Sequence, residues 1–307
     1  MHALPFVIAL ASGAILAPLL IRALRDAGQT RANYRQRELP FPFGVLTLAA
    51  ALVALIPLTL LQKLASTQIF HPEMGPIAVY ALGVLALGLI DDMLARDGHR
   101  GRDSDGGHDS NRGREGDSAR GGADAGTRLP QRGWRGHGAA VLRGEFSTGA
   151  LKAAGSLGLA LLAMSYLGLS NGRWLLAAAV LVLATNAFNL LDLRPGRATK
   201  AFVLLGAGLA IGSADLRALW ALGLFVAPAL VAGVYDLRER AMLGDTGANL
   251  LGALAGLWLV LSLSKTGQLI ALALLLGITV YGELRSISAL IERTPGLRRL
   301  DSWGRPT

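Results

Sequence analysis

The stretch Tyr235–Leu251, YDLRERAMLGDTGANLL, decides how this chain folds, because it is a short polar segment between two long apolar runs at about 216–235 and 247–264. Each run is long enough, at roughly 18 to 20 residues, to cross a bilayer as a helix. Within the segment, Gly244-Asp245-Thr246-Gly247 places a carboxylate between glycines. An acid where a membrane helix begins is costly and usually has a function, so Asp245 is the first candidate for chemistry.

The composition of the whole chain indicates a membrane protein. Of its 307 residues, 52% are hydrophobic and 17% are charged, and the mean hydropathy is +0.45. A soluble domain is far less apolar than this. The absence of cysteine excludes disulfides and thiolate metal sites. Because backbone groups in lipid must be satisfied within the spanning element, we expect an all-α polytopic membrane protein.

Nine apolar stretches predict nine transmembrane helices. They cover approximately residues 3–23, 42–62, 75–93, 149–168, 173–191, 198–213, 216–235, 247–264 and 267–284. The first has no basic region before it and no clear cleavage site, so we interpret it as a retained helix. We expect one membrane domain, with three helices in 1–95, six in 141–284 and a cytoplasmic tail at 285–307.

The basic residues predict the orientation of the chain. Of its 30 Lys and Arg residues, 26 fall in alternate connections, and only Lys63, Arg173, Arg217 and Lys265 fall in the others. Because cytoplasmic loops are rich in Lys and Arg, we expect the N-terminus outside and the C-terminus in the cytoplasm. The net charge of +9 therefore reports topology and does not indicate nucleic-acid binding.

The connection at 96–140 is rich in glycine and mixed charge and almost free of apolar residues. Such a segment buries too little surface to offset its ordering entropy, so we expect disorder. His99, His108 and His137 lie within it. A metal-binding tract and solvated loop histidines are both conceivable, and solvated histidines are the more common case.

Two of the predicted cytoplasmic helix ends carry acids and amides. The third helix ends in Gly88-Leu89-Ile90-Asp91-Asp92, where adjacent carboxylates should favour binding of protons or a divalent cation. The alternative is that they are the first solvated residues after the membrane. The fifth helix carries Asn186, Asn189 and Asp192 at three-residue spacing on one face. The alternative for these is hydrogen bonding between helices.

Cations occur at the same predicted face. Arg194-Pro195-Gly196-Arg197 ends the fifth helix, Arg35 precedes the second helix, and Lys152 lies in the first turn of the fourth, after Ser147-Thr148-Gly149. An anion at a helix N-terminus would be stabilised by such residues. Alone, each is also typical of an ordinary cap or of a membrane interface.

Together, the Asp-Asp of the third helix, the N-x-x-N-x-x-D of the fifth and the G-D-x-G before the eighth resemble the motifs of the polyprenyl-phosphate N-acetylhexosamine-1-phosphate transferases. This family includes the MraY, WecA and TagO enzymes. The resemblance spans roughly residues 30–285. It implies an Mg²⁺-dependent transferase of the bacterial plasma membrane, with its active site facing the cytoplasm. Such an enzyme moves a sugar phosphate from a UDP-sugar to undecaprenyl phosphate and releases UMP. The lipid-linked product would serve cell-wall or other envelope glycan synthesis.

The resemblance also implies roles for particular residues. Asp245 would be a metal ligand, with Asn189 as a second ligand or a pyrophosphate contact. Asp91 and Asp92 would position the lipid phosphate and act as, or near, the catalytic base. The substrate-binding residues would be Lys152, Asn186, Asn189, Asp192, Arg194 and Arg35. A homodimer is left open.

The sequence departs from the family in three places. Leu193-Arg194-Pro195-Gly196 follows Asp192 where the family commonly continues with a second acid, no histidine follows Tyr281, and nine helices are predicted where many members have ten. The rival hypothesis is a diverged non-catalytic homologue that binds lipid phosphate or acts as an assembly partner. A transporter is a weaker third hypothesis, because broken helices with midplane charges in repeated halves are absent from the sequence.

Overall fold

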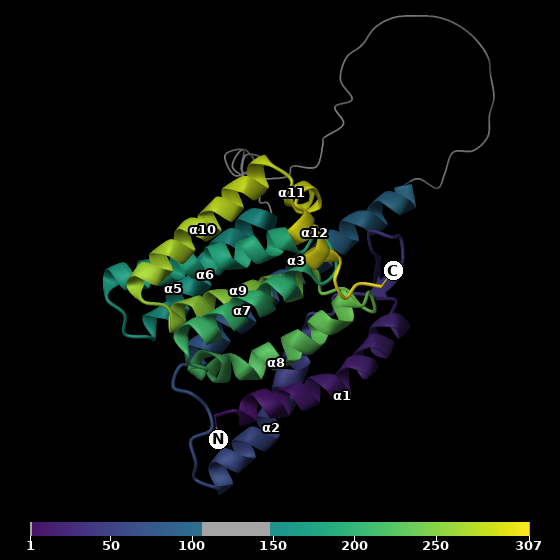
Figure 1. Ribbon diagram of the computed structural model, residues 1–307. Coiled ribbons are helices and arrows are strands. Elements are labelled where there is room, and N and C mark those ends of the chain that lie inside the picture. The colour runs from purple at the N-terminus through teal and green to yellow at the C-terminus, as the bar shows by residue number, and fades with distance from the viewer. Residues whose placement is uncertain (1, 106–147, 307) are drawn as a thin grey trace, which may run out of the picture.

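A computed structural model describes residues 2–105 and 148–306 (Figure 1). Its long helices are α1 (Leu4–Asp26), α2 (Val45–Leu64), α3 (Met74–Asp105), α5 (Thr148–Ser165), α6 (Asn171–Leu191), α7 (Arg197–Ser213), α8 (Arg217–Leu237), α9 (Gly244–Ser262) and α10 (Lys265–Leu284). Two short helices follow, α11 (Ile287–Arg293) and α12 (Pro295–Ser302). A two-stranded hairpin, β1 (Thr30–Ala32) and β2 (Glu38–Pro40), joins α1 to α2.

The helices confirm a multi-pass membrane architecture. Within the described residues, seven helices are long and apolar enough to span a bilayer, namely α1, α2, α3, α6, α8, α9 and α10. The two other predicted spans also form helices, α5 and α7, but α7 has only 17 residues and the apolar part of α5 is Gly149–Ser165. The count of nine crossings and their orientation stay predictions.

Two elements differ from the sequence expectation. Helix α3 continues to Asp105, so the segment predicted to be disordered from residue 96 begins as helix; residues 106–147 of that prediction lie outside the described part of the chain. Extending an existing helix adds one hydrogen bond per residue fixed, which favours this continuation beyond the membrane. The antiparallel hairpin was also not expected, and it lies in a connection where its outer backbone groups can meet water.

Helix α9 forms the centre of the bundle, between α6, α3, α7 and α8 (Figure 1). In α9, 83% of the apolar span is buried, against 22% in the peripheral α10. Small residues allow this close packing, since a methyl group at Gly252 would lie 2.6 Å from Cα of Thr185 in α6. The helix that carries Asp245 in its first turn is therefore held by neighbours on all sides.

The polar helix ends collect at one end of the bundle. The hairpin, α11, α12 and the C-terminus lie together there, whereas the N-terminus lies at the opposite end of α1 (Figure 1). Hydrogen bonds tie this end together, for example from Arg35 to the Pro306 carbonyl oxygen and from the Asp245 amide to Asp92. The motifs singled out in the sequence thus share one face of the molecule.

Candidate functional site

The first turn of α9 is held by a carboxylate from α3. The Asp92 carboxylate accepts hydrogen bonds from the Asp245 N–H (2.9 Å), the Thr246 N–H (2.8 Å) and the Thr246 hydroxyl (2.6 Å). The first N–H groups of a helix have no partner within the helix, and a negative charge is favourable at this end. Asp92 therefore caps α9 from outside, which explains why an acid only 3% exposed is tolerated at this position.

Glycines permit this close approach of α3 to α9. Gly244 has a φ of +71°, and a Cβ at this position would lie 2.6 Å from Oδ2 of Asp92. A Cβ at Gly88 would lie 2.6 Å from the Asp245 carbonyl oxygen. Gly88 and Gly244 thus serve packing, because they let the acidic residues of two helices meet.

Lys152 joins Asp91 to Asp245. Its Nζ donates to Oδ2 of Asp91 at 3.1 Å and also contacts Oδ2 of Asp245, so one ammonium bridges two carboxylates. The three side chains are only partly accessible, at 17% for Lys152, 27% for Asp91 and 35% for Asp245. The structure therefore brings together three of the predicted site residues, from α5, α3 and α9.

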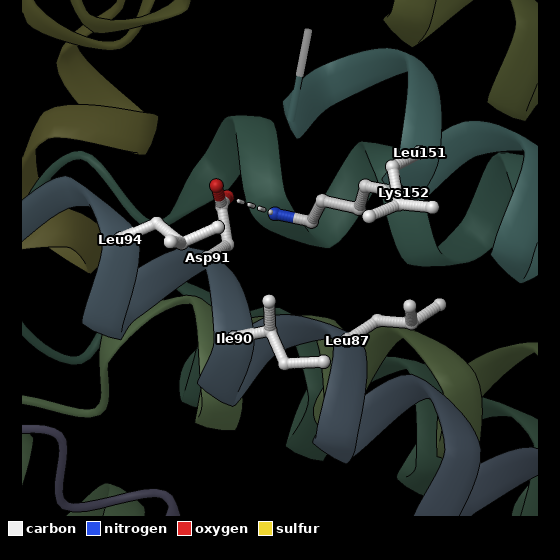
Figure 2. A pocket seen from close by; sticks show the side chains of 6 residues that line it. All are labelled: Leu87, Ile90, Asp91, Leu94, Leu151 and Lys152. Atoms are coloured by element: carbon white, nitrogen blue, oxygen red, sulfur yellow. Dashed lines mark hydrogen bonds and ion pairs between the residues drawn. The ribbon is translucent and has the colours of Figure 1, made fainter. Parts of the chain in front are cut away.

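Apolar side chains surround one side of this ion pair. Figure 2 shows Asp91 and Lys152 pointing toward one another beside a cavity lined also by Leu87, Ile90, Leu94 and Leu151. The cavity measures about 10 Å³, which is roughly the space of one water molecule. A phosphate could not enter here unless the lining side chains moved.

Asp192 lies directly after α6, half-buried and close to the other acids. Its pKa is raised well above the usual value, first by burial and then by the negative charges of Asp236, Asp245 and Asp92, while Arg197 opposes the shift. Asp192 therefore lies within electrostatic reach of the acids of α3, α8 and α9, and its carboxyl has an increased tendency to hold a proton. Its role in a nucleotide-sugar site stays a prediction.

The two asparagines of α6 are placed differently. Asn186 donates from Nδ2 to the hydroxyl of Thr279 in α10 at 3.3 Å, which is the hydrogen bonding between helices weighed as its alternative. Asn189 is half-buried one turn nearer the end of α6, and within the described residues no hydrogen bond joins its amide to Lys152 or Asp245.

Asp236 is a further acid of this region that was not singled out from the sequence. It is 4% exposed, and its carboxylate accepts from the N–H of Gly196 at 2.6 Å and of Leu243 at 3.3 Å. It therefore fixes the loop after α6 to the segment before α9. The signal was present, since Asp236, like Asp91, is an acid at the end of an apolar run.

The two predicted phosphate-binding arginines lie in a separate group. Arg35 is 3.7 Å from Glu239, Arg194 pairs with Glu292 of α11, and both guanidinium groups lie over the Tyr34 ring, at 5.4 and 5.7 Å. Arg35 and Arg194 thus contact the hairpin and the tail, and their predicted contact with phosphate stays a prediction. Sequence spacing does not show which acids fold back onto a loop.

The C-terminal tail is bound to the start of α7. Asp301 accepts two hydrogen bonds from Arg197 (2.9 and 3.0 Å) and two from Arg305 (2.7 and 3.1 Å). All three side chains are less than a tenth exposed. Burial opposes ionisation of Asp301, but the two guanidinium groups prevail and lower its pKa to about 2. Arg305 also donates to the carbonyl oxygen of Pro195 at 2.8 Å, so the tail covers the loop after Asp192.

Compared with protein-family models and with curated proteins, the sequence matches none of them.

Proposed function

We propose that this protein is a phosphoglycosyl transferase that moves a sugar 1-phosphate from a UDP-sugar to a polyprenyl phosphate and releases UMP. The observation that carries the proposal is the convergence of Asp91 and Asp245 on the ammonium of Lys152, at the start of a buried helix and on the face that gathers the other motifs. Membrane helices alone would need none of these interfacial acids. The family resemblance supplies the identity of the substrates.

The site fits a bound Mg²⁺. Two carboxylate oxygens, Oδ2 of Asp91 and Oδ2 of Asp245, already approach a single cation, and hard divalent cations take such oxygen ligands. The described residues contain no cluster of three or more His, Asp or Glu side chains arranged for a metal. We propose Mg²⁺ because it commonly uses one or two carboxylates and completes its shell with water and substrate phosphates. Asn189 stays a proposed additional ligand.

The reaction joins two anions, so charge neutralisation is its main requirement. A lipid phosphate oxygen would attack the phosphorus attached to the sugar, while the bond from that phosphorus to the bridging oxygen breaks and UMP leaves with the electron pair. When bound, Mg²⁺ would supply neutralisation of the pyrophosphate. Lys152 would hold a phosphate through its ammonium. The second oxygen of Asp91, Oδ1, would accept a proton from the lipid phosphate, since this carboxylate is partly accessible.

Asp92 receives a positioning role in this proposal. Its oxygens are used by three hydrogen bonds to α9 and it is almost fully buried, which argues against the direct contact with lipid phosphate expected from the sequence. Asp192 would face the nucleotide sugar, next to Asp236. Arg35, Arg194 and Asn186 would act through the hairpin, the tail and α10, because their present partners lie in those elements.

The proposed topology follows the basic residues. We place the N-terminus outside, nine helices across a bacterial plasma membrane and the site at the cytoplasmic face, where the prenyl tail stays in lipid while its phosphate reaches water. Homodimer formation remains open within this proposal.

The direct test is UMP release by the purified full chain with undecaprenyl phosphate, Mg²⁺ and a panel of UDP-sugars. We expect release with at least one sugar and none without Mg²⁺ or without lipid phosphate. A family member of known activity serves as the positive control in the same micelles. If that enzyme releases UMP and this chain releases none with any sugar, the transferase proposal fails, and binding of lipid phosphate alone would then favour the non-catalytic homologue.

A further inference from the structure

The proposed metal position is already filled by a cation that belongs to the protein. The Lys152 ammonium contacts Oδ2 of Asp91 and Oδ2 of Asp245, the two oxygens best placed to bind a divalent ion. Two carboxylates and one ammonium leave a net charge of −1 on this group. An ion of charge +2 at the same point would compete with the ammonium, because two cations cannot share these oxygens without strong repulsion.

The two carboxylates stand on short side chains whose backbones are held by the packing of α3 against α9, whereas the ammonium stands at the end of a long side chain. The backbone of Asp245 is held by Asp92, and its carbonyl oxygen packs against Gly88. Asp91 lies in α3 next to the buried Asp92. Lys152, by contrast, reaches the group through a four-carbon side chain from the second turn of α5, past Leu87, Ile90 and Leu151 (Figure 2). A lysine stem of this kind can change rotamer while staying in contact with apolar surface.

We propose that Lys152 is the resident counter-ion of this site and exchanges with the divalent cation. In the metal-free protein its ammonium neutralises Asp91 and Asp245; arrival of the metal displaces the ammonium, which then meets the anionic substrate. The inference rests on the proposed function for the identity of that substrate, but the exchange itself concerns only the metal and this chain. It gives Lys152 a second task beyond the phosphate contact expected from the sequence.

The exchange and a merely structural role of Lys152 predict opposite changes in metal affinity when the lysine is removed. If Lys152 competes with the metal, removing its charge must tighten metal binding, because the ion no longer has to displace an ammonium. If Lys152 instead holds the acids in a geometry that the metal needs, removing it must weaken binding. Measuring the metal affinity in the absence of any substrate separates the two.

The first experiment compares Mn²⁺ binding, followed by electron paramagnetic resonance, in the full-length wild type, in Lys152→Met and in Lys265→Met. Lys265 is the exposed first residue of α10, at the end of that helix away from α11, so its substitution changes the net charge equally without touching the site. We expect Kd to fall by about tenfold or more in Lys152→Met and to stay unchanged in Lys265→Met. An unchanged or higher Kd in Lys152→Met overturns the exchange.

A double variant guards against misfolding of Lys152→Met, in which two acids lose their partner. Asp91→Asn combined with Lys152→Met removes one negative and one positive charge, so the net charge of the group is that of the wild type. We expect its melting temperature to be near that of the wild type and its Kd for Mn²⁺ to lie above that of Lys152→Met. A double variant that folds and binds Mn²⁺ as tightly as Lys152→Met would show that Asp91 does not bind the metal, and would refute an exchange at the pair of carboxylates.

Displacement of the ammonium can also be observed directly. Reductive methylation with mass-spectrometric detection reports how accessible each lysine amine is, and Lys152 is only 17% exposed while paired. We expect saturating Mg²⁺ to increase modification of Lys152 and to leave modification of Lys265 unchanged. Equal modification of Lys152 with and without Mg²⁺ would overturn the exchange. Neither experiment uses lipid or UDP-sugar, so their outcome is independent of whether the chain releases UMP.

Discussion

At the scale of single residues, the backbone and the side chain of Asp245 have different roles, so a substitution can test the proposed chemistry without disturbing the fold. Its N–H donates to Asp92 and so anchors α9, whereas its carboxylate contacts the ammonium of Lys152. Asp245→Asn keeps the volume and the backbone, so we expect a melting temperature within about 2 °C of the wild type and a loss of UMP release of about 100-fold or more. Initial rates and thermal unfolding in the same detergent check this. Near-normal rates would remove Asp245 from the proposed metal site.

Asp92 is expected to behave in the opposite way. Asp92→Ala leaves two N–H groups and a hydroxyl without their acceptor in the interior, which should cost about 3 kcal/mol of unfolding free energy, whereas Asp92→Asn keeps one accepting oxygen and should cost about half as much. Equilibrium unfolding of the three proteins measures the series. Equal stability of all three would contradict the capping role.

The sequence predicted a shared role for Asp91 and Asp92, but it did not predict that they face different neighbours. Successive helix positions are about 100° apart, and only the packing identifies each neighbour.

At the scale of elements, the tail helix α12 depends on Asp301. Its folded-state pKa of about 2 lies below the usual 3.8, so its ionised form stabilises the fold fully above about pH 4, and this contribution is lost as the pH falls toward 2. The shift corresponds to about 2 kcal/mol. We therefore expect Asp301→Asn to lower the melting temperature at pH 7 and the difference from the wild type to shrink between pH 4 and pH 2.5. A difference that does not change with pH over this range would show that the two arginines do not stabilise the ionised carboxylate.

The elements also show where helical periodicity stops being informative. Asn186, Asn189 and Asp192 recur every three residues, which predicts a shared face, yet each step drifts by about 60° from the 3.6-residue period. Over two steps the side chains diverge by about 120°, and Asn186 accordingly meets Thr279 while Asp192 meets the charges of Asp236 and Asp245. The apolar runs predicted the helices well because their signal is summed over some twenty residues. A site residue depends on one side chain, and its partner comes from a distant part of the chain.

At the scale of the whole molecule, the sequence predicted that the polar motifs share one face, and the motifs of α3 and α9 do meet, since the Asp245 N–H donates to the Asp92 carboxylate. It did not predict that the tail closes over this face. The tail has no long apolar run, and its binding depends on Asp301 pairing with Arg197, more than a hundred residues earlier. Long-range ion pairs leave no local pattern in a sequence. The sequence therefore singled out Asp91, Lys152 and Asp245, but it did not indicate that the C-terminal tail packs over this end of the bundle.

Which compartment this face meets is the remaining question for the whole molecule, and the absence of cysteine makes it directly testable. Gln68 is exposed at the end of the bundle away from the site, and Ser302 is exposed in α12 beside it. Because 26 of the 30 basic residues fall in the connections that the sequence predicts to be cytoplasmic, the positive-inside rule predicts that a membrane-impermeant maleimide labels Gln68→Cys in intact bacterial cells and labels Ser302→Cys only after the membrane is opened. The cysteine-free wild type controls for background labelling. Labelling of Ser302→Cys in intact cells would place Asp91, Lys152 and Asp245 outside the cytoplasm. A cytoplasmic UDP-sugar does not reach that side, so this result would contradict both the topology and the transferase proposal.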